Sequence, residues 1–154
     1  MTLKLVRFAA AARLAMGSTI LAALVLAGCD TTVRRDELAS VEYGPKPARW
    51  REVIKSYLDI RLTSPKDAVV EYRSEPKQLF QRETLLRERQ YGWAVCVWVN
   101  DKNRQGSFDG FYPMTVFLRD EKIVAVNNGP DDFGVVASRY AREQCELLGA
   151  RFRG

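Results

Sequence analysis

Histidine is absent from this chain of 154 residues. Its absence removes the side chain that most often acts as a general base near neutral pH, and also the commonest metal ligand in proteins. A Ser-His-Asp or Cys-His catalytic site is therefore excluded. A zinc site would have to take its four ligands from cysteines and carboxylates alone, so we expect neither a bound metal ion nor a cofactor.

Net charge is small once the first 28 residues are set apart. Three of the 24 basic residues, Lys4, Arg7 and Arg13, lie in that stretch without any acidic residue, which leaves 21 basic against 19 acidic residues. The resulting net charge of +2 is too weak to indicate a nucleic-acid partner. A hydrophobic fraction of 47% and a charged fraction of 28% are typical of a globular protein, and the length suits one domain.

The N-terminal apolar stretch is too short to span a bilayer. Residues 14–26 carry no charge, but a membrane-spanning helix needs about 20 apolar residues. Because this stretch follows a basic start, residues 1–28 are typical of a secretion signal. The stretch ends in Leu26-Ala27-Gly28-Cys29, which resembles the lipobox of bacterial lipoproteins. The alternative is a plain secretory signal followed by a chance cysteine.

The lipobox resemblance implies a lipid anchor. It implies that diacylglycerol is attached to Cys29, that the chain is cleaved before this residue, and that the new N-terminus is acylated. Several acyl chains hold a protein on a membrane essentially permanently. We therefore expect a bacterial membrane protein that faces the periplasm. Asp30 resembles the signal that retains a lipoprotein in the inner membrane, which favours that membrane slightly.

Few cysteines remain once Cys29 carries lipid. Cys96 and Cys145 can form only one intramolecular disulfide in an oxidising compartment. Cys96 falls in a strand-like segment and Cys145 in a helix-like one, so the bond would tie a helix to a sheet. The alternative is two buried free thiols.

The mature chain is predicted to consist of a tether and one domain. Residues 29–47 are mostly polar or small and finish in a Gly-Pro-Lys-Pro segment that blocks a helix. Residues 48–154 form the domain, which begins with a helix over about 48–62. One apolar stripe of helical period indicates this helix, and it consists of Trp50, Val53, Ile54, Tyr57 and Leu58.

Three later segments are predicted to be antiparallel strands. Residues 93–100 are apolar on both faces, which predicts a central strand covered on each side. Residues 112–119 and 122–127 predict two more strands, joined by a tight turn at Asp120-Glu121. Residues 68–72 are a shorter candidate. The conformation of the segment 74–90 is left open, and within it residues 82–89 are consistent with either a charged helix or an exposed edge ribbon.

A final helix is predicted to end near Leu148, with Asp131 or Asp132 as its N-cap. One side of it would pack on the sheet, formed by Ala137, Ala141, Cys145 and Leu148. The predicted fold is therefore α+β. It has an N-terminal helix, an antiparallel sheet of three to four strands, and a C-terminal helix tied to the sheet.

The most distinctive stretch is 91–110. It contains a Gly-aromatic strand, a Val-Cys-Val core, the sequence Asn-Asp-Lys-Asn over 100–103, and a Gly-Ser-Phe-Asp-Gly loop over 106–110. This pattern is similar to one in small exported proteins of proteobacteria. The resemblance covers about a quarter of the chain and implies a fold and a location, but no catalytic residue.

The loop after the central strand has two interpretations. The first is a plain connection, in which glycines permit positive φ angles and Asn100 and Asn103 bond the local backbone. The second is a calcium loop, because the spacing of five residues matches positions 1, 3, 5, 6 and 9 of an EF-hand: Asp101, Asn103, Gln105, Gly106 and Asp109. Position 12 is Tyr112, where that motif requires glutamate.

Catalytic constellations are weak. Ser107 with Lys102 could form a Ser-Lys pair, and Asp109 with Asp131 or Asp132 could supply paired carboxylates for glycoside hydrolysis. The simpler interpretation places these side chains in polar loops and at a helix cap. We therefore expect a protein that is not an enzyme.

Aromatic side chains gather around the central strand and its loop. They are Trp93, Trp98, Phe108, Phe111 and Tyr112, most of which we expect in the core. Exposed members beside Arg104 would make a contact patch, because aromatics and arginine dominate binding hot spots. The expected contact residues are Asp101, Asn103, Arg104, Phe108, Asp109, Phe111 and Tyr112.

The sequence thus favours a lipid-anchored cell-envelope module that binds an envelope protein without catalysis. An inhibitor or accessory factor of an envelope enzyme is the alternative, and a cell-wall glycan hydrolase is a third possibility.

Overall fold

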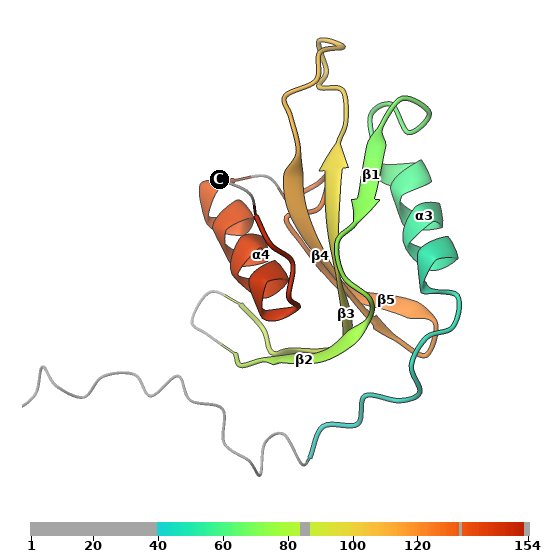
Figure 1. The fold of residues 1–154 in the computed structure, drawn as a ribbon, viewed down its shortest axis with the longest axis vertical. Helices are drawn as coiled ribbons and strands as arrows, with labels where there is room; N and C mark the ends of the chain where they lie inside the picture. The colour runs from blue at the N-terminus through green and yellow to red at the C-terminus, as the bar shows by residue number, and fades with distance from the viewer. Residues whose placement is uncertain (1–39, 84–86, 133, 153–154) are drawn as a thin grey trace, which may run out of the picture. The chain divides into compact units, whose positions relative to one another are not determined.

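The computed structural model describes residues 40–83, 87–132 and 134–152, so Cys29, Asp30 and the predicted signal lie outside the described residues. The fold is α+β, as the sequence predicts, with two helices around one antiparallel sheet of five strands (Figure 1). In chain order the elements are α3 (Trp50–Arg61), β1 (Val69–Tyr72), β2 (Lys77–Gln81), β3 (Gln90–Asn100), β4 (Tyr112–Arg119), β5 (Lys122–Asn127) and α4 (Val135–Leu147).

The sheet is built around β3, which is the predicted central strand. On one side β3 pairs with β4, and β4 pairs with β5. On the other side β1 and β2 pair with successive parts of β3, β1 with its last residues and β2 with its first. The extra strand, β2, comes from the segment whose conformation the sequence left open. Its residues have little apolar periodicity of their own, and pairing with β3 determines their extended form.

Gly92 lies in β3 beside the backbone of Leu118 in β4. A Cβ atom at this position would lie 2.7 Å from the carbonyl oxygen of Leu118. The glycine of the Gly-aromatic strand therefore permits close backbone approach. At the far end of β4, Asp120 and Glu121 have φ angles of 50° and 58°, which matches the tight turn predicted there.

The two helices cover opposite faces of the sheet (Figure 1). The apolar stripe of α3 packs against the face of β3 and β4 that carries Val95, Val97 and Val116. Both faces of β3 are thus buried, which explains why this strand is apolar at nearly every position.

The second face of the sheet packs against α4 through the side predicted for it. Ala137, Ala141, Cys145 and Leu148 are all buried. A disulfide joins Cys96 of β3 to Cys145 of α4, which confirms the predicted pairing. The bond ties the C-terminal helix to the centre of the sheet.

The predicted cap of α4 is wrong. The N-cap residue is Gly134, and no side chain caps the helix. Asp131 instead forms an ion pair with Arg61 of α3, with 2.7 Å between Oδ2 and Nη1. Asp132 Oδ2 accepts a bond from the backbone N–H of Asn128 at 3.4 Å. Both carboxylates are therefore held by partners outside the helix.

The end of the predicted tether contacts the domain. Trp93 Nε1 donates a 3.1 Å hydrogen bond to the carbonyl oxygen of Gly44, and the Tyr43 ring meets the Tyr91 ring edge-on. The Glu121 carboxylate accepts a 2.6 Å bond from the Ala48 backbone N–H. These contacts bring the incoming chain to the start of β3 and to the β4–β5 turn.

Candidate functional site

The loop predicted to make partner contacts lies at the end of the sheet opposite the incoming chain. It connects the last residue of β3, Asn100, to the first residue of β4, Tyr112. The incoming chain contacts Tyr91 near the start of β3. Nine residues of extended strand separate the two points, which corresponds to about 30 Å.

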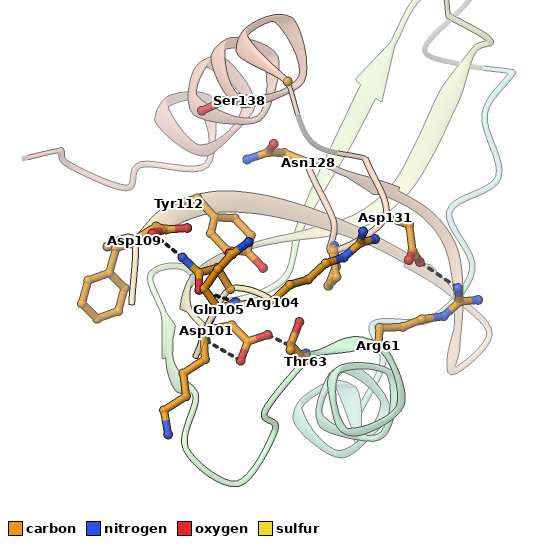
Figure 2. A pocket seen from close by; sticks show the side chains of 16 residues that line it. Arg61, Thr63, Asp101, Arg104, Gln105, Asp109, Tyr112, Asn128, Asp131 and Ser138 are labelled. Atoms are coloured by element: carbon orange, nitrogen blue, oxygen red, sulfur yellow. Dashed lines mark hydrogen bonds and ion pairs between the residues drawn. The ribbon is translucent and has the colours of Figure 1, made fainter. Parts of the chain in front are cut away.

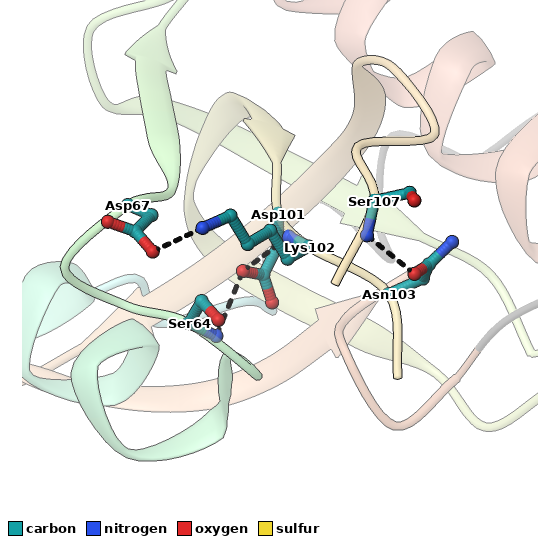
Figure 3. A network of polar contacts seen from close by, with 6 residues as sticks. All are labelled: Ser64, Asp67, Asp101, Lys102, Asn103 and Ser107. Atoms are coloured by element: carbon teal, nitrogen blue, oxygen red, sulfur yellow. Dashed lines mark hydrogen bonds and ion pairs between the residues drawn. The ribbon is translucent and has the colours of Figure 1, made fainter. Parts of the chain in front are cut away.

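Asp101 anchors the base of this loop. Its carboxylate accepts bonds from the backbone N–H groups of Thr63 at 2.6 Å, Ser64 at 3.1 Å and Lys102 at 2.8 Å. The first two donors follow the end of α3, so one side chain joins the loop to the helix. Lys102 adds a second link, because its Nζ lies 2.6 Å from Asp67 Oδ2 (Figure 3).

Asn103 organises the tip of the loop. Its Oδ1 accepts 3.0 Å bonds from the backbone N–H groups of Gln105 and Ser107, and its Nδ2 donates to Asp109 Oδ1 at 2.9 Å. The predicted local bonding by Asn103 is confirmed. The same prediction for Asn100 is wrong, because no described residue provides a hydrogen-bond partner for its buried Oδ1.

The contacts of the loop do not favour the calcium interpretation. The side-chain oxygens of Asp101 and Asn103 accept hydrogen bonds from backbone N–H groups, whereas in an EF-hand the corresponding oxygens coordinate the ion. No cluster of three or more metal-binding side chains occurs among the residues that the structure describes. The loop is organised by its own hydrogen bonds.

A cleft of about 860 Å³ opens beside this loop (Figure 2). Its walls come from the loop, from the end of α3 and from the connection between β5 and α4. Residues from all three walls include Arg61, Asn103, Arg104, Phe111, Asn128 and Asp131. Its volume lies within the range of small-ligand and peptide sites, roughly 300–1,000 Å³.

Tyr112 forms part of the cleft wall at the start of β4. Burial raises the pKa of its phenol well above the usual value near 10, and the charges on Asp101 and Tyr57 raise it further. The phenol is therefore neutral throughout the physiological pH range.

Replacing Tyr112 with phenylalanine is expected to reduce the alkaline destabilisation of the protein. A raised folded-state pKa means that stability is complete below the unfolded-state pKa near 10 and falls as the pH rises above it. Unfolding by urea at pH 8 and pH 10.5 measures this loss. We expect a smaller loss for Tyr112→Phe than for the wild type, and equal losses would contradict the burial of the phenol.

Replacing Asp101 with alanine is expected to destabilise the protein by about 1 to 2 kcal/mol. Three backbone N–H groups lose a charged acceptor; one of these bonds is exposed and two are partly buried. Asp109→Ala is the matched control, because this exposed carboxylate holds one side-chain bond; we expect a change within about 0.5 kcal/mol. Urea unfolding of both variants tests the difference, and equal stabilities would show that Asp101 does not anchor the loop.

The five aromatic residues around β3 divide into two groups. Trp93, Trp98 and Tyr112 are partly buried, whereas Phe108 and Phe111 are 48% and 43% exposed. Trp98 stacks on Phe152 of the C-terminal segment, with 5.2 Å between ring centroids, and lies 6.1 Å from the Phe111 ring. The exposed members are therefore those on the loop.

The candidate carboxylates for glycoside hydrolysis do not form a matched acid and base. Asp109 and Asp131 line the same cleft, and both are exposed. Asp109 accepts a hydrogen bond from Asn103, and Asp131 accepts one from Arg61. Neither lies in the apolar surroundings that a proton-donating carboxyl requires. The Ser107 backbone N–H donates a hydrogen bond to Asn103, and Lys102 forms an ion pair with Asp67.

The chain matches no protein-family model, no curated protein and no solved structure. None of the helices that the structure describes is long and apolar enough to cross a membrane.

Sequence reasoning did not assign Arg61, Asn128 or the end of α3 to this site. Asn128 has a φ of 55° and donates a 2.6 Å bond from Nδ2 to the carbonyl oxygen of Pro113. The Asn-Asn-Gly-Pro sequence signals the turn at this point. Nothing in the sequence indicates that this turn lies beside a loop about 25 residues earlier.

Proposed function

We propose that this protein is a lipid-anchored module of the bacterial cell envelope that faces the periplasm and binds a partner protein without catalysis. The basic start, the short apolar stretch and the lipobox-like residues before Cys29 support the anchor. The single observation that carries the binding role is the braced loop 101–112, which leaves Phe108 and Phe111 exposed.

The bracing of this loop supports a recognition role. The Asp101 and Asn103 side chains bond the loop backbone and the residues after α3, so the conformation of the loop is largely formed before a partner arrives. A preformed loop loses little conformational entropy on binding. Exposed aromatic side chains on such a loop provide contact area at low entropic cost.

The position of the loop also supports this role. The incoming chain meets the domain near Tyr91, and the loop lies about 30 Å away at the far end of β3. An anchor at Cys29 would therefore leave the loop end free to contact a periplasmic partner.

The anchor is tested by the intact mass of protein purified from membranes. We expect a chain that begins at Cys29 and carries acyl groups. The Cys29→Ser variant is expected to lose the acyl groups and to leave the membrane fraction. An unmodified chain of full length would contradict the anchor.

The binding role is tested by crosslinking intact cells and purifying the protein with its adducts. Phe108→Ser/Phe111→Ser is expected to lower the recovery of a specific partner at least tenfold. Val124→Ser/Leu147→Ser is the matched control, because it removes two exposed apolar side chains outside the loop. Equal recovery from both double variants would rule out the loop as the contact.

The same braced loop is compatible with an accessory factor or inhibitor that inserts it into the cleft of an envelope enzyme. An activity assay on any enzyme recovered by crosslinking distinguishes the two roles. Inhibition or activation that depends on Phe108 and Phe111 would support the regulatory role.

A further inference from the structure

Exposed apolar side chains are concentrated at the loop end of the domain. Eight large apolar side chains are exposed in the described part of the chain. Two of them, Val124 and Leu147, belong to segments toward the other end. The remaining six belong to segments that meet at the loop end, and we call them the loop-end surface: Ile60, Val69, Phe108, Phe111, Val135 and Val136.

Two members of this surface come from the elements that precede β3. Ile60 lies in the last turn of α3, next to Arg61, which lines the cleft. Val69 begins β1 and pairs with Asn100, the last residue of β3. Both residues therefore lie beside the base of the loop.

Two further members come from the start of α4. Val135 and Val136 are its first residues and follow Gly134, which lines the cleft. The Val135 side chain is 88% exposed. Phe111 lines the cleft itself, and Ile60 and Val135 are next in the chain to residues that line it. Isolated apolar residues scattered over a surface, in contrast, would need no explanation.

Among the described residues that line the cleft, Arg104 is the cation that has no hydrogen bond or ion pair. Arg61 and Lys102 are paired with Asp131 and Asp67. No hydrogen bond or ion pair joins Arg104 to another residue that the structure describes, although it lines the cleft. In Figure 2 its side chain extends from the loop toward the segment that carries Asp131.

The carboxylates that line the cleft, in contrast, each have a partner, which for Asp131 is Arg61. Asp101 accepts three backbone N–H bonds, and Asp109 accepts a bond from Asn103. Arg104 presents five N–H donors in a planar fork that matches a carboxylate. Among the described residues, none accepts a hydrogen bond from this fork, which leaves Arg104 available to a carboxylate from outside the chain.

We infer that the loop-end surface docks a segment of a partner protein in which a carboxylate lies among apolar side chains. The carboxylate accepts a bidentate bond from Arg104, and the apolar side chains pack on Phe111 and Val135. An apolar contact area combined with one directed charge pair is typical of specific protein interfaces. This inference rests on the proposed function and gives the chemistry of the partner.

The experiment uses the full chain in its native cells, with the photoreactive residue benzoylphenylalanine as the probe. The probe replaces Phe111 or Val135 in the surface, and Leu147 at the other end of α4 as the matched control. In the chain with the probe at 135, Arg104→Glu and Arg104→Lys test the charge pair. Lys122→Glu reverses an exposed charge at the start of β5 as a control.

We expect the probes at 111 and 135 to give an adduct of the same mass, and the probe at 147 to give none. Arg104→Glu is expected to lower the adduct yield at least tenfold, because it replaces an attraction with a repulsion. Arg104→Lys is expected to retain part of the yield, and Lys122→Glu all of it. Sequencing of the adduct is expected to find an acidic residue among apolar ones.

An adduct at 111 that is missing at 135, or that is indifferent to Arg104→Glu, would overturn the inference and leave the proposed function standing. No adduct at either position would overturn both. Adducts with lipid alone, or with a second copy of this chain, would identify a membrane or a self-association surface and would also overturn the inference.

Discussion

Replacing Cys96 and Cys145 together with alanine is expected to lower the free energy of unfolding by about 4 kcal/mol. The two residues are 49 positions apart, and the chain-entropy model assigns this amount to a closed loop of that size. The loss is large compared with a typical total stability of roughly 5–15 kcal/mol. Urea unfolding under oxidising conditions measures the difference between variant and wild type.

The control is the wild type reduced under denaturing conditions and refolded in reductant. It is expected to match the double variant, because both lack the covalent constraint on the unfolded chain. The double variant itself is expected to be indifferent to reductant. A wild type that is equally stable in both conditions would show that the disulfide contributes no stability.

Replacing Phe117 with alanine is expected to cost about 3 to 5 kcal/mol. Its side chain is fully buried and packs with Cys145 and Leu148 between β4 and α4. Removal of a buried aromatic ring loses its transfer free energy and leaves a cavity that the neighbours fill only partly. Urea unfolding at neutral pH measures the cost, with the disulfide kept oxidised.

Val124→Ala on β5 is the matched control for this change. Val124 is exposed, and we expect a change within about 0.5 kcal/mol because surface substitutions rarely disturb packing. A cost below about 1 kcal/mol for Phe117→Ala would show that α4 does not pack tightly on the sheet. If removing the disulfide from the Phe117→Ala variant then lowered the free energy of unfolding further, this result would indicate that the covalent bond alone holds the helix.

The elements predicted correctly from the sequence are those with a strong local pattern. The apolar stripe of α3 repeats with helical period, and β4 and β5 are apolar segments on either side of a two-residue turn. The turn at Asp120-Glu121 follows from the strands on either side of it. β3 is apolar on both faces, which predicts cover on both sides, and α3 and α4 provide it.

The candidate site was predicted only in part. The loop 101–112 was identified from its glycines, asparagines and aromatics, and Asn103 bonds its local backbone as expected. The roles of Asp101 and Asp131 were not predicted, because their partners, Thr63 and Arg61, lie 38 and 70 positions away along the chain. Spacing within a motif carries no information about such contacts.

The sequence by itself determined the α+β class and the elements that have a strong local pattern, because periodicity is a local property. The Cys96–Cys145 pair followed from assigning Cys29 to the lipid anchor, which stays a prediction. The tertiary structure decided that β2 joins the sheet, that Gly134 rather than an aspartate begins α4, and that three distant segments enclose one cleft. It also decided which phenylalanines are exposed. These features depend on how the sheet brings separate chain segments together, since burial and pairing are properties of neighbours in space.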